Sequence, residues 1–285
     1  MKVVVNTSSE RYIHSFEPDE QARLIRQGRF LEPWIQPTVD FSGCASVLEV
    51  GCGVGAQLQV LLRRFPDTRF TGIDASATQL ERARGFLSEA VAAGRVELTQ
   101  ASAFCLPFPD ASFDGACIYW VLEHLPDHVG ALREVLRVLK PGGVLYCTEV
   151  FNSGLYAHPP QPALASYWRA FNTLQEELGG DPDAGVRLAA LFERAGFERI
   201  AFYDVSVQMD ARISEMAARH DFVDFWQTLL LSGAPKLLQH GRITALDIDA
   251  LKAAFTTLAE TPQAIFRYAA MQARGYKPVQ TEHAS

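Results

Sequence analysis

The 285-residue chain is long enough for one large domain or two small ones. Hydrophobic residues make up 48% of it and charged residues 21%, values typical of a globular protein with a sizeable core. It contains no run of about 18 apolar residues, so we expect no transmembrane helix and no membrane partner. The net charge of −7, with no basic block longer than Arg63-Arg64, disfavours nucleic acid as a partner.

The N-terminus and the cysteines both favour a cytoplasmic protein. Residues 1–9 hold one Lys and only a short apolar run, unlike a secretory signal peptide. The five cysteines form no CxxC pair and show no metal-ligand spacing, which is typical of buried thiols in a reducing compartment. They are Cys44, Cys52, Cys105, Cys117 and Cys147. We therefore expect no metal site; the sequence leaves open whether the protein is a monomer or a homodimer.

The elements begin with an N-terminal helical arm over residues 1–43, whose helix runs from Pro18 to Gln27. Asp19 and Glu20 in its first turn suit the helix dipole. From Ser46 to about Met209, short apolar runs then alternate with segments of helical periodicity. Strands are expected at Ser46–Val50, Arg69–Ile73, Val96–Gln100, Phe113–Tyr119, Val144–Val150 and Arg199–Val207. Helices are expected at Gly55–Phe65, Ser76–Ala93, Ala131–Leu139 and Leu188–Ala195.

This alternation predicts an α/β fold, a mostly parallel sheet covered by helices on both faces. Pro141-Gly142-Gly143 is expected to stop a helix and turn into the next strand, and Gly196 to cap a helix C-terminus.

Two regions interrupt the alternation and predict helical additions to one domain. Residues 151–185 contain a helical stretch from Ala163 to Leu178, and residues 211–260 are helical almost throughout, with Asp247 as a candidate cap. The apolar run Ala264–Ala273 fits a strand or a helix by periodicity alone.

The sharpest motif is the strand and glycine turn Val47–Gly55, which contains Gly51, Gly53 and Gly55. Such a turn lets the backbone approach a ligand closely at a helix N-terminus. Asp74 ends the second strand, where a carboxylate can accept the hydroxyl hydrogens of a ribose or cap the helix that follows. Together these features indicate an adenine nucleoside site without separating NAD from S-adenosylmethionine.

Two details favour S-adenosylmethionine. Glu49 stands in an otherwise apolar strand, and a buried carboxylate needs a partner such as the cationic amino group of this ligand, which NAD lacks. The glycine spacing is GxGxG and not the GxGxxG of dinucleotide sites.

Six motifs, taken in order, resemble the class I, Rossmann-like S-adenosylmethionine-dependent methyltransferases that act on small molecules. They are Val47–Gly55, Gly72–Ser76, Leu106–Phe108, Ser112–Gly115, Val121–Leu125 and Leu136–Gly143. The resemblance covers about residues 44–210 and 264–278. It implies a doubly wound seven-stranded sheet with one antiparallel strand, formed by residues 44–210 and 261–278. Residues 151–185 and 211–260 would form a helical lid.

The resemblance also implies the cofactor-binding residues. Gly51, Cys52 and Gly53 would line the methionine portion with Glu49, and Asp74 would hold the ribose. The residues expected around the rest of the cofactor are Ala75, Gln79, Ser102, Ala103, Phe104, Tyr119, Trp120 and Tyr12. Ser102 departs from the family, in which many members carry Asp at this position.

Methyl transfer from a sulfonium is an in-line displacement of a neutral leaving group, so the protein mainly aligns the nucleophile and excludes water, without a metal. A weakly acidic nucleophile would still need a general base. The candidates are His124, His14 and His158, each of which also has a purely structural explanation. Aromatic residues of the lid would either bind an apolar substrate or form the core of the lid. They include Tyr156, Trp168, Phe171, Phe222 and Trp226.

Three other hypotheses remain open at this stage. The chain is an NAD-dependent oxidoreductase, or it binds S-adenosylmethionine but catalyses an elimination or cyclisation, or it is a non-catalytic binding module.

Overall fold

A seven-stranded sheet forms the centre of the computed structural model, which describes residues 13–14 and 17–279. The strand order is β3-β2-β1-β4-β5-β10-β7. The strands are β1 (Ser46–Val50), β2 (Arg69–Asp74), β3 (Val96–Gln100), β4 (Phe113–Tyr119), β5 (Leu139–Val150), β7 (Glu198–Asp204) and β10 (Ala270–Tyr276). Strands β1 to β5 pair in parallel, whereas β10 runs antiparallel to both β5 and β7. The predicted Rossmann-like sheet with one antiparallel strand is confirmed.

The strand order places a crevice at the ends of β1 and β4. The chain builds outward from β1 through β2 to β3 and then returns to place β4 on the other side of β1. In open α/β sheets, ligands bind at such a switch point, outside the carboxyl ends of the strands.

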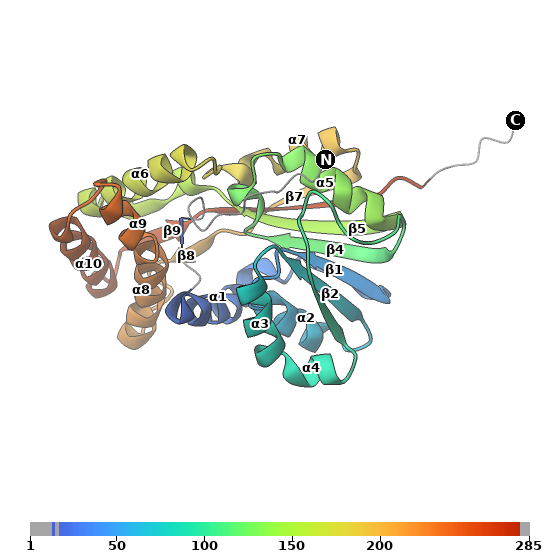
Figure 1. Cartoon of the computed structure of the whole chain (residues 1–285). Coiled ribbons are helices and arrows are strands. Elements are labelled where there is room, and N and C mark those ends of the chain that lie inside the picture. Colours follow the sequence, from blue (N-terminus) through green and yellow to red (C-terminus); the bar gives the residue numbers. More distant parts are fainter. Residues whose placement is uncertain (1–12, 15–16, 280–285) are drawn as a thin grey trace, which may run out of the picture.

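Helices cover both faces of the sheet, as Figure 1 shows. One face packs on α1 (Pro18–Ile35), α2 (Ala56–Arg64), α3 (Ala77–Phe86) and α4 (Ser88–Ala92). The other face packs on α5 (His128–Val138) and α7 (Ala184–Ala195). Successive side chains of β1 point to opposite faces of the sheet. Val47 therefore packs in the first core, whereas Leu48 and Val50 pack in the second.

A helical layer lies at one end of the sheet (Figure 1). It consists of α6 (Pro162–Glu177), α8 (Met216–Leu231), α9 (Ala234–Gln239) and α10 (Ala245–Glu260). Beneath it lies a small antiparallel sheet that the sequence did not predict, in the order β6-β9-β8. Its strands are β6 (Tyr156–His158), β8 (Val207–Met209) and β9 (Ile265–Tyr268). The ambiguous run 264–273 therefore forms strands, and only Ala269 separates β9 from β10.

The predicted bounds of β1, β3 and β4 agree with the structure, but other predicted elements differ. The strand expected over Arg199–Val207 is divided, because Ser206 donates its backbone N–H to the Asp204 carboxylate (2.9 Å) in a turn that sends β8 into the small sheet. The helix expected over Ser76–Ala93 is divided at Leu87 into α3 and α4.

Pro141 and Gly142 lie inside β5 and not before it, at an irregularity in its pairing with β4 where Gly142 has φ +79°.

Helix ends bear out one predicted cap and revise another. Gly196 ends α7 in the left-handed conformation (φ +102°), as predicted. The cap of α10 is Thr244, and Asp247 is its reciprocal partner in a capping box. The N-terminal helix also continues beyond Gln27 to Ile35.

Cysteine burial is mixed: Cys52, Cys117 and Cys147 are buried, whereas Cys105 is exposed. In the described part of the chain, no helix combines the length and apolar character needed to cross a membrane.

Candidate functional site

The glycine turn after β1 is shaped by packing at its two ends and by open space at its centre. Gly51, Gly53 and Gly55 all have positive φ, between +50° and +79°. A Cβ on Gly51 would lie 2.4 Å from Val121, and one on Gly55 would lie 2.6 Å from Leu87. A Cβ on Gly53 would meet nothing within 4 Å. The outer glycines therefore allow close packing, whereas Gly53 borders free space that a ligand can occupy.

Asp74, at the end of β2, joins the glycine turn to the start of α3. Its carboxylate accepts the backbone N–H of Gly53 (2.9 Å) and that of Ser76 (2.8 Å), the residue that caps α3. Burial raises the pKa of Asp74, and these hydrogen bonds oppose the rise. Each carboxylate oxygen keeps a second lone pair, so Asp74 can hold the turn and still accept hydrogen bonds from a ligand.

Glu49 is the buried acid of β1, only 2% exposed. Burial raises its pKa well above the ordinary value, and the nearby Asp74 adds to the rise. Its Oε2 atom has no hydrogen-bond partner. A carboxylate oxygen without a partner in the interior is costly, so this atom fits a cationic ligand group.

One cavity of about 1500 Å³ opens along this edge of the sheet and collects almost all of the predicted cofactor residues. The lining includes Glu49, Gly51, Cys52, Gly53, Asp74, Ala75, Gln79, Ser102, Ala103, Phe104, Tyr119 and Trp120. Tyr12 lies outside the described residues. Since pockets for one drug-sized ligand span about 300–1,000 Å³, this cavity has room for two ligands side by side.

Hydrogen bonds fix several of these residues. Ser102 accepts the backbone N–H of Phe104 on its hydroxyl (3.2 Å), which holds the turn after β3. Gln79 accepts a bond from Gln21 of α1 (3.0 Å). The N-terminal helix thus supports the half of the cavity that the predicted cofactor residues line, which we call the cofactor half. The Tyr119 hydroxyl accepts a bond from Gln36 (3.2 Å).

Trp120, directly after β4, adopts a backbone conformation that is rare for a bulky residue. Its φ is +60°, while its N–H continues the sheet by donating to Thr148 (2.9 Å). The indole Nε1 is buried without a partner. Such left-handed residues cost about 1–3 kcal/mol and cluster at functional sites.

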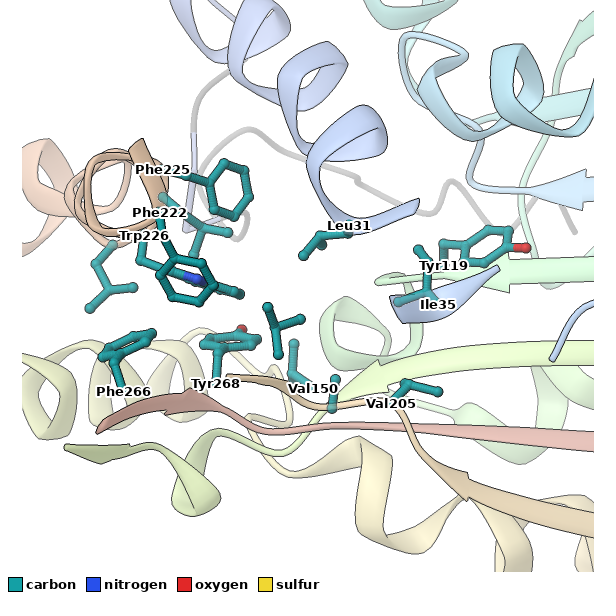
Figure 2. Close-up of a cluster of buried hydrophobic side chains, with 14 of the residues drawn as sticks. Leu31, Ile35, Tyr119, Val150, Val205, Phe222, Phe225, Trp226, Phe266 and Tyr268 are labelled. Atoms are coloured by element: carbon teal, nitrogen blue, oxygen red, sulfur yellow. The ribbon is translucent and has the colours of Figure 1, made fainter. Parts of the chain in front are cut away.

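Aromatic rings wall the other half of the cavity, which we call the acceptor half. They are Trp168, Phe171, Trp226 and Tyr268. Trp168 stacks on Phe171 with ring centroids 4.8 Å apart, and Trp226 stacks on Tyr268 at 4.3 Å. Figure 2 shows Trp226 of α8 facing Tyr268 at the end of β9. The sequence prediction missed Tyr268, whose run was recognised only as a candidate strand.

Three predicted residues are not brought to this cavity. Tyr156 and His158 lie on the same face of β6, and the side chains of both are exposed. Phe222 is buried behind the wall, between Phe30 (5.6 Å) and Phe266 (6.2 Å). It belongs to the core of the helical layer, the alternative that the sequence left open.

The histidines His14 and His124 both line the cavity, with ring centroids 6.3 Å apart in an edge arrangement. His14 Nδ1 lies 2.7 Å from the Ser232 hydroxyl, whose own hydrogen goes to the Leu229 carbonyl (2.6 Å). Burial lowers the pKa of His14, and burial lowers the pKa of His124 to about 4. Both rings are therefore neutral near pH 7.

Two buried acids lie beside this histidine pair, and the sequence prediction identified neither. Glu149 of β5 accepts the N–H groups of Val121 (2.8 Å) and Leu122 (2.6 Å) on one oxygen, Oε1. Glu123 lines the cavity and accepts a bond from Gln175 (2.6 Å). Burial raises the pKa of both acids, and Glu123 adds to the rise at Glu149. The only signal in the sequence was that Glu149 is an acidic residue near the end of an apolar strand.

Helix α1 brings a buried ion pair to the cavity wall. Arg23 donates to both carboxylate oxygens of Glu20 (2.8 and 2.6 Å) and to Gln27 (2.5 Å). Arg23 and Gln27 line the cavity. Among the described residues, no group of three His, Cys, Asp or Glu side chains is arranged to hold a metal ion.

The part of the chain that forms this site matches known protein sequences. Residues 48–147 match the family model described as a methyltransferase domain. The chain is 36% identical over 160 residues to O-methyltransferase resE of Aspergillus sclerotiorum, covering 56% of this chain and 57% of that protein. It is 34% identical over 173 residues to demethylmenaquinone methyltransferase of Listeria monocytogenes serotype 4a, strain HCC23, covering 55% and 71%. The chain thus spans only a little over half the length of resE.

Solved structures share the fold at low sequence identity. The [4+2]-cyclase SpnF matches with a TM-score of 0.51 and 23% identity, covering 90% of this chain and 82% of that one. Geranyl diphosphate C-methyltransferase from Streptomyces coelicolor A3(2) matches with a TM-score of 0.52 and 13% identity, covering 88% and 78%. At such identities these matches support the fold alone.

Proposed function

Because this chain belongs to the class I S-adenosylmethionine-dependent methyltransferases, we propose that it methylates an oxygen, nitrogen or carbon nucleophile of a small molecule. The acceptor is partly aromatic or apolar, and the donor is S-adenosylmethionine. The observation that carries the proposal is the cavity of about 1500 Å³, which joins the glycine turn and its two acids to an aromatic wall. Membership of this family sets aside the NAD-dependent alternative.

The residues of the cofactor half fit S-adenosylmethionine. The partnerless oxygen of Glu49 suits the ammonium group, and the spare lone pairs of Asp74 suit the ribose hydroxyls. The open side of Gly53 leaves room for the methionine portion. Ser102, Ala103 and Phe104 are in place to border the adenine. The bound cofactor supplies a methyl group already activated by a sulfonium.

The acceptor half aligns the nucleophile and excludes water. Trp168, Phe171 and Trp226 offer flat apolar surface to an aromatic or apolar acceptor. Alignment supplies much of the rate enhancement here, because the donor is activated and the leaving group is neutral. The transfer therefore needs no metal.

For an acceptor that must lose a proton, the histidine pair provides the base. Neutral imidazole is the form that accepts a proton, and lowered pKa values keep both rings neutral at pH 7. His14 lines the cavity and contacts Phe171 of the aromatic wall. His124 lies beside it at the same wall.

The test is a screen of metabolite extracts with S-adenosylmethionine carrying a labelled methyl group. We expect label in a small molecule and an equal amount of S-adenosylhomocysteine. Asp74→Ala should lose both products, because the variant lacks the carboxylate that accepts the ribose hydroxyls. Binding of S-adenosylmethionine without any S-adenosylhomocysteine formed would contradict methyl transfer.

That contrary outcome would favour a second candidate, a cyclisation or elimination assisted by the cofactor's positive charge. The fold is compatible with this activity, because a protein named as a [4+2]-cyclase shares it over 90% of this chain. A substrate consumed in the same extracts without incorporation of label would identify this activity.

A further inference from the structure

A second pocket of about 450 Å³ lies beside the acceptor half, between the segment 152–161 and helix α6. Leu155, Ala157 and Leu164 give it an apolar floor, and Arg169 and Glu176 lie among its polar residues. It shares two residues with the main cavity, Asn152 and Trp168. Trp168 therefore stands in the partition between the two spaces.

The indole of Trp168 is held in place from several directions. Its Nε1 donates to the Asn152 carbonyl (2.9 Å), and its ring stacks on Phe171 at an interplanar angle of 17°. Tyr268 packs against it with ring centroids 6.0 Å apart. The side chain is only 5% exposed. A ring fixed by a hydrogen bond and by two aromatic neighbours acts as a wall and not as a swinging gate.

Asn152, the other shared residue, is equally constrained. Its amide donates to Asn172 of α6 (3.0 Å), and its side-chain oxygen accepts a bond from the Tyr268 hydroxyl (3.3 Å). The partition thus belongs to a network that ties α6 to the small sheet.

We propose that Trp168 is a specificity-determining residue that limits how long an acceptor the site takes. An acceptor whose apolar tail extends toward α6 meets the indole and stops there. Replacing the indole with a small side chain joins the pocket of about 450 Å³ to the acceptor half. This inference rests on the proposed function of that half as the acceptor site.

The experiment measures how affinity depends on chain length, using a series from 4-ethylphenol to 4-octylphenol as probes. Isothermal calorimetry is performed on the full chain saturated with S-adenosylhomocysteine. Burial of each methylene is worth about 0.8 kcal/mol, so affinity should rise about fourfold per added carbon while the tail finds apolar space. In the wild type the rise in affinity should stop at a definite chain length, which we call the break. In Trp168→Ala the affinity should continue to rise for several carbons beyond the wild-type break.

Glu176→Ala is the matched control, because Glu176 lines the second pocket and not the main cavity. It shortens a side chain of the second pocket and leaves the indole in place, so its break should stay within one carbon of the wild-type length. Trp168→Leu keeps an apolar side chain and should move the break by fewer carbons than Trp168→Ala. It serves as the test if the alanine variant does not fold.

Two results would overturn the inference: an unchanged break in both Trp168 variants, or an equal extension in Glu176→Ala. The affinity for S-adenosylhomocysteine, measured first on each protein, keeps the two proposals apart. Failure of the wild type to bind it contradicts the proposed function, whereas normal binding with an unmoved break contradicts only the role of Trp168.

Discussion

At the scale of single residues, the site combines side chains that sequence patterns reveal with others that only the fold assembles. The glycines and Asp74 follow from a local motif, because a tight turn and a strand-end acid leave a fixed spacing. Arg23, Glu149 and Tyr268 could not be predicted as part of the site. Each comes from a different part of the chain and reaches the site region through packing of distant elements.

The open side of Gly53 leads to the first prediction. Gly53→Arg should lower the affinity for S-adenosylhomocysteine by at least about a hundredfold, equal to about 2.7 kcal/mol, because the new side chain enters the cavity. Calorimetry measures the affinity, and thermal melting checks the fold. Gly85→Arg, on the exposed face of α3 with nothing within 4 Å of its Cβ, is the control and should bind normally. Equal binding by the two variants would contradict the assignment of the turn.

Glu149 leads to a prediction about pH. Burial and the nearby Glu123 raise its pKa to about 8, from the ordinary value of 4.5 for a glutamate. Between these values the folded state binds a proton that the unfolded chain has lost, so the free energy of unfolding falls as pH rises. The slope reaches about 1.4 kcal/mol per pH unit for one full proton. Glu149→Gln removes this titration and should flatten the slope.

Glu149→Gln keeps the two shortest hydrogen bonds, from Val121 and Leu122, because both go to Oε1, which the amide oxygen replaces. Urea unfolding at pH 5, 6, 7 and 8 gives the slope for each protein. Glu81→Gln, on the exposed face of α3, should retain the wild-type slope. The same slope in Glu149→Gln as in the wild type would show that the acid is ionised throughout.

At the scale of elements, strands and helices of the sheet were predictable where burial follows a simple period. β1, β3 and β4 are short apolar runs between clear turns, and their bounds agree with the structure. β8 was not separable from β7, because both are apolar and the turn at Asp204 depends on a single side-chain bond. The length of α1 beyond Gln27 depends on tertiary contacts of Leu31 and Ile35, which are buried in the core.

Helix α1 carries a prediction of its own. Arg23→Met should lower the free energy of unfolding by about 3 kcal/mol, because it leaves the Glu20 carboxylate buried without its cationic partner. Denaturant titration measures the loss. Arg29→Met, one or two turns along the same helix and exposed, should cost less than about 1 kcal/mol. The double variant Arg23→Met with Glu20→Leu should recover part of the lost free energy of unfolding. If it recovers none, the unpaired carboxylate of Glu20 is not the cause of the loss.

At the scale of the whole molecule, the strand run from Ile265 to Tyr276 joins the two halves of the cavity. Tyr268 closes the aromatic wall, and two residues later Ala270 pairs with Val150 at the end of β5. The position of the aromatic wall relative to the end of β5 is therefore set by one continuous piece of backbone and not by a hinge. Variation in what is methylated should then arise by exchanging side chains on α6 and α8, while the spacing needed for chemistry is inherited unchanged.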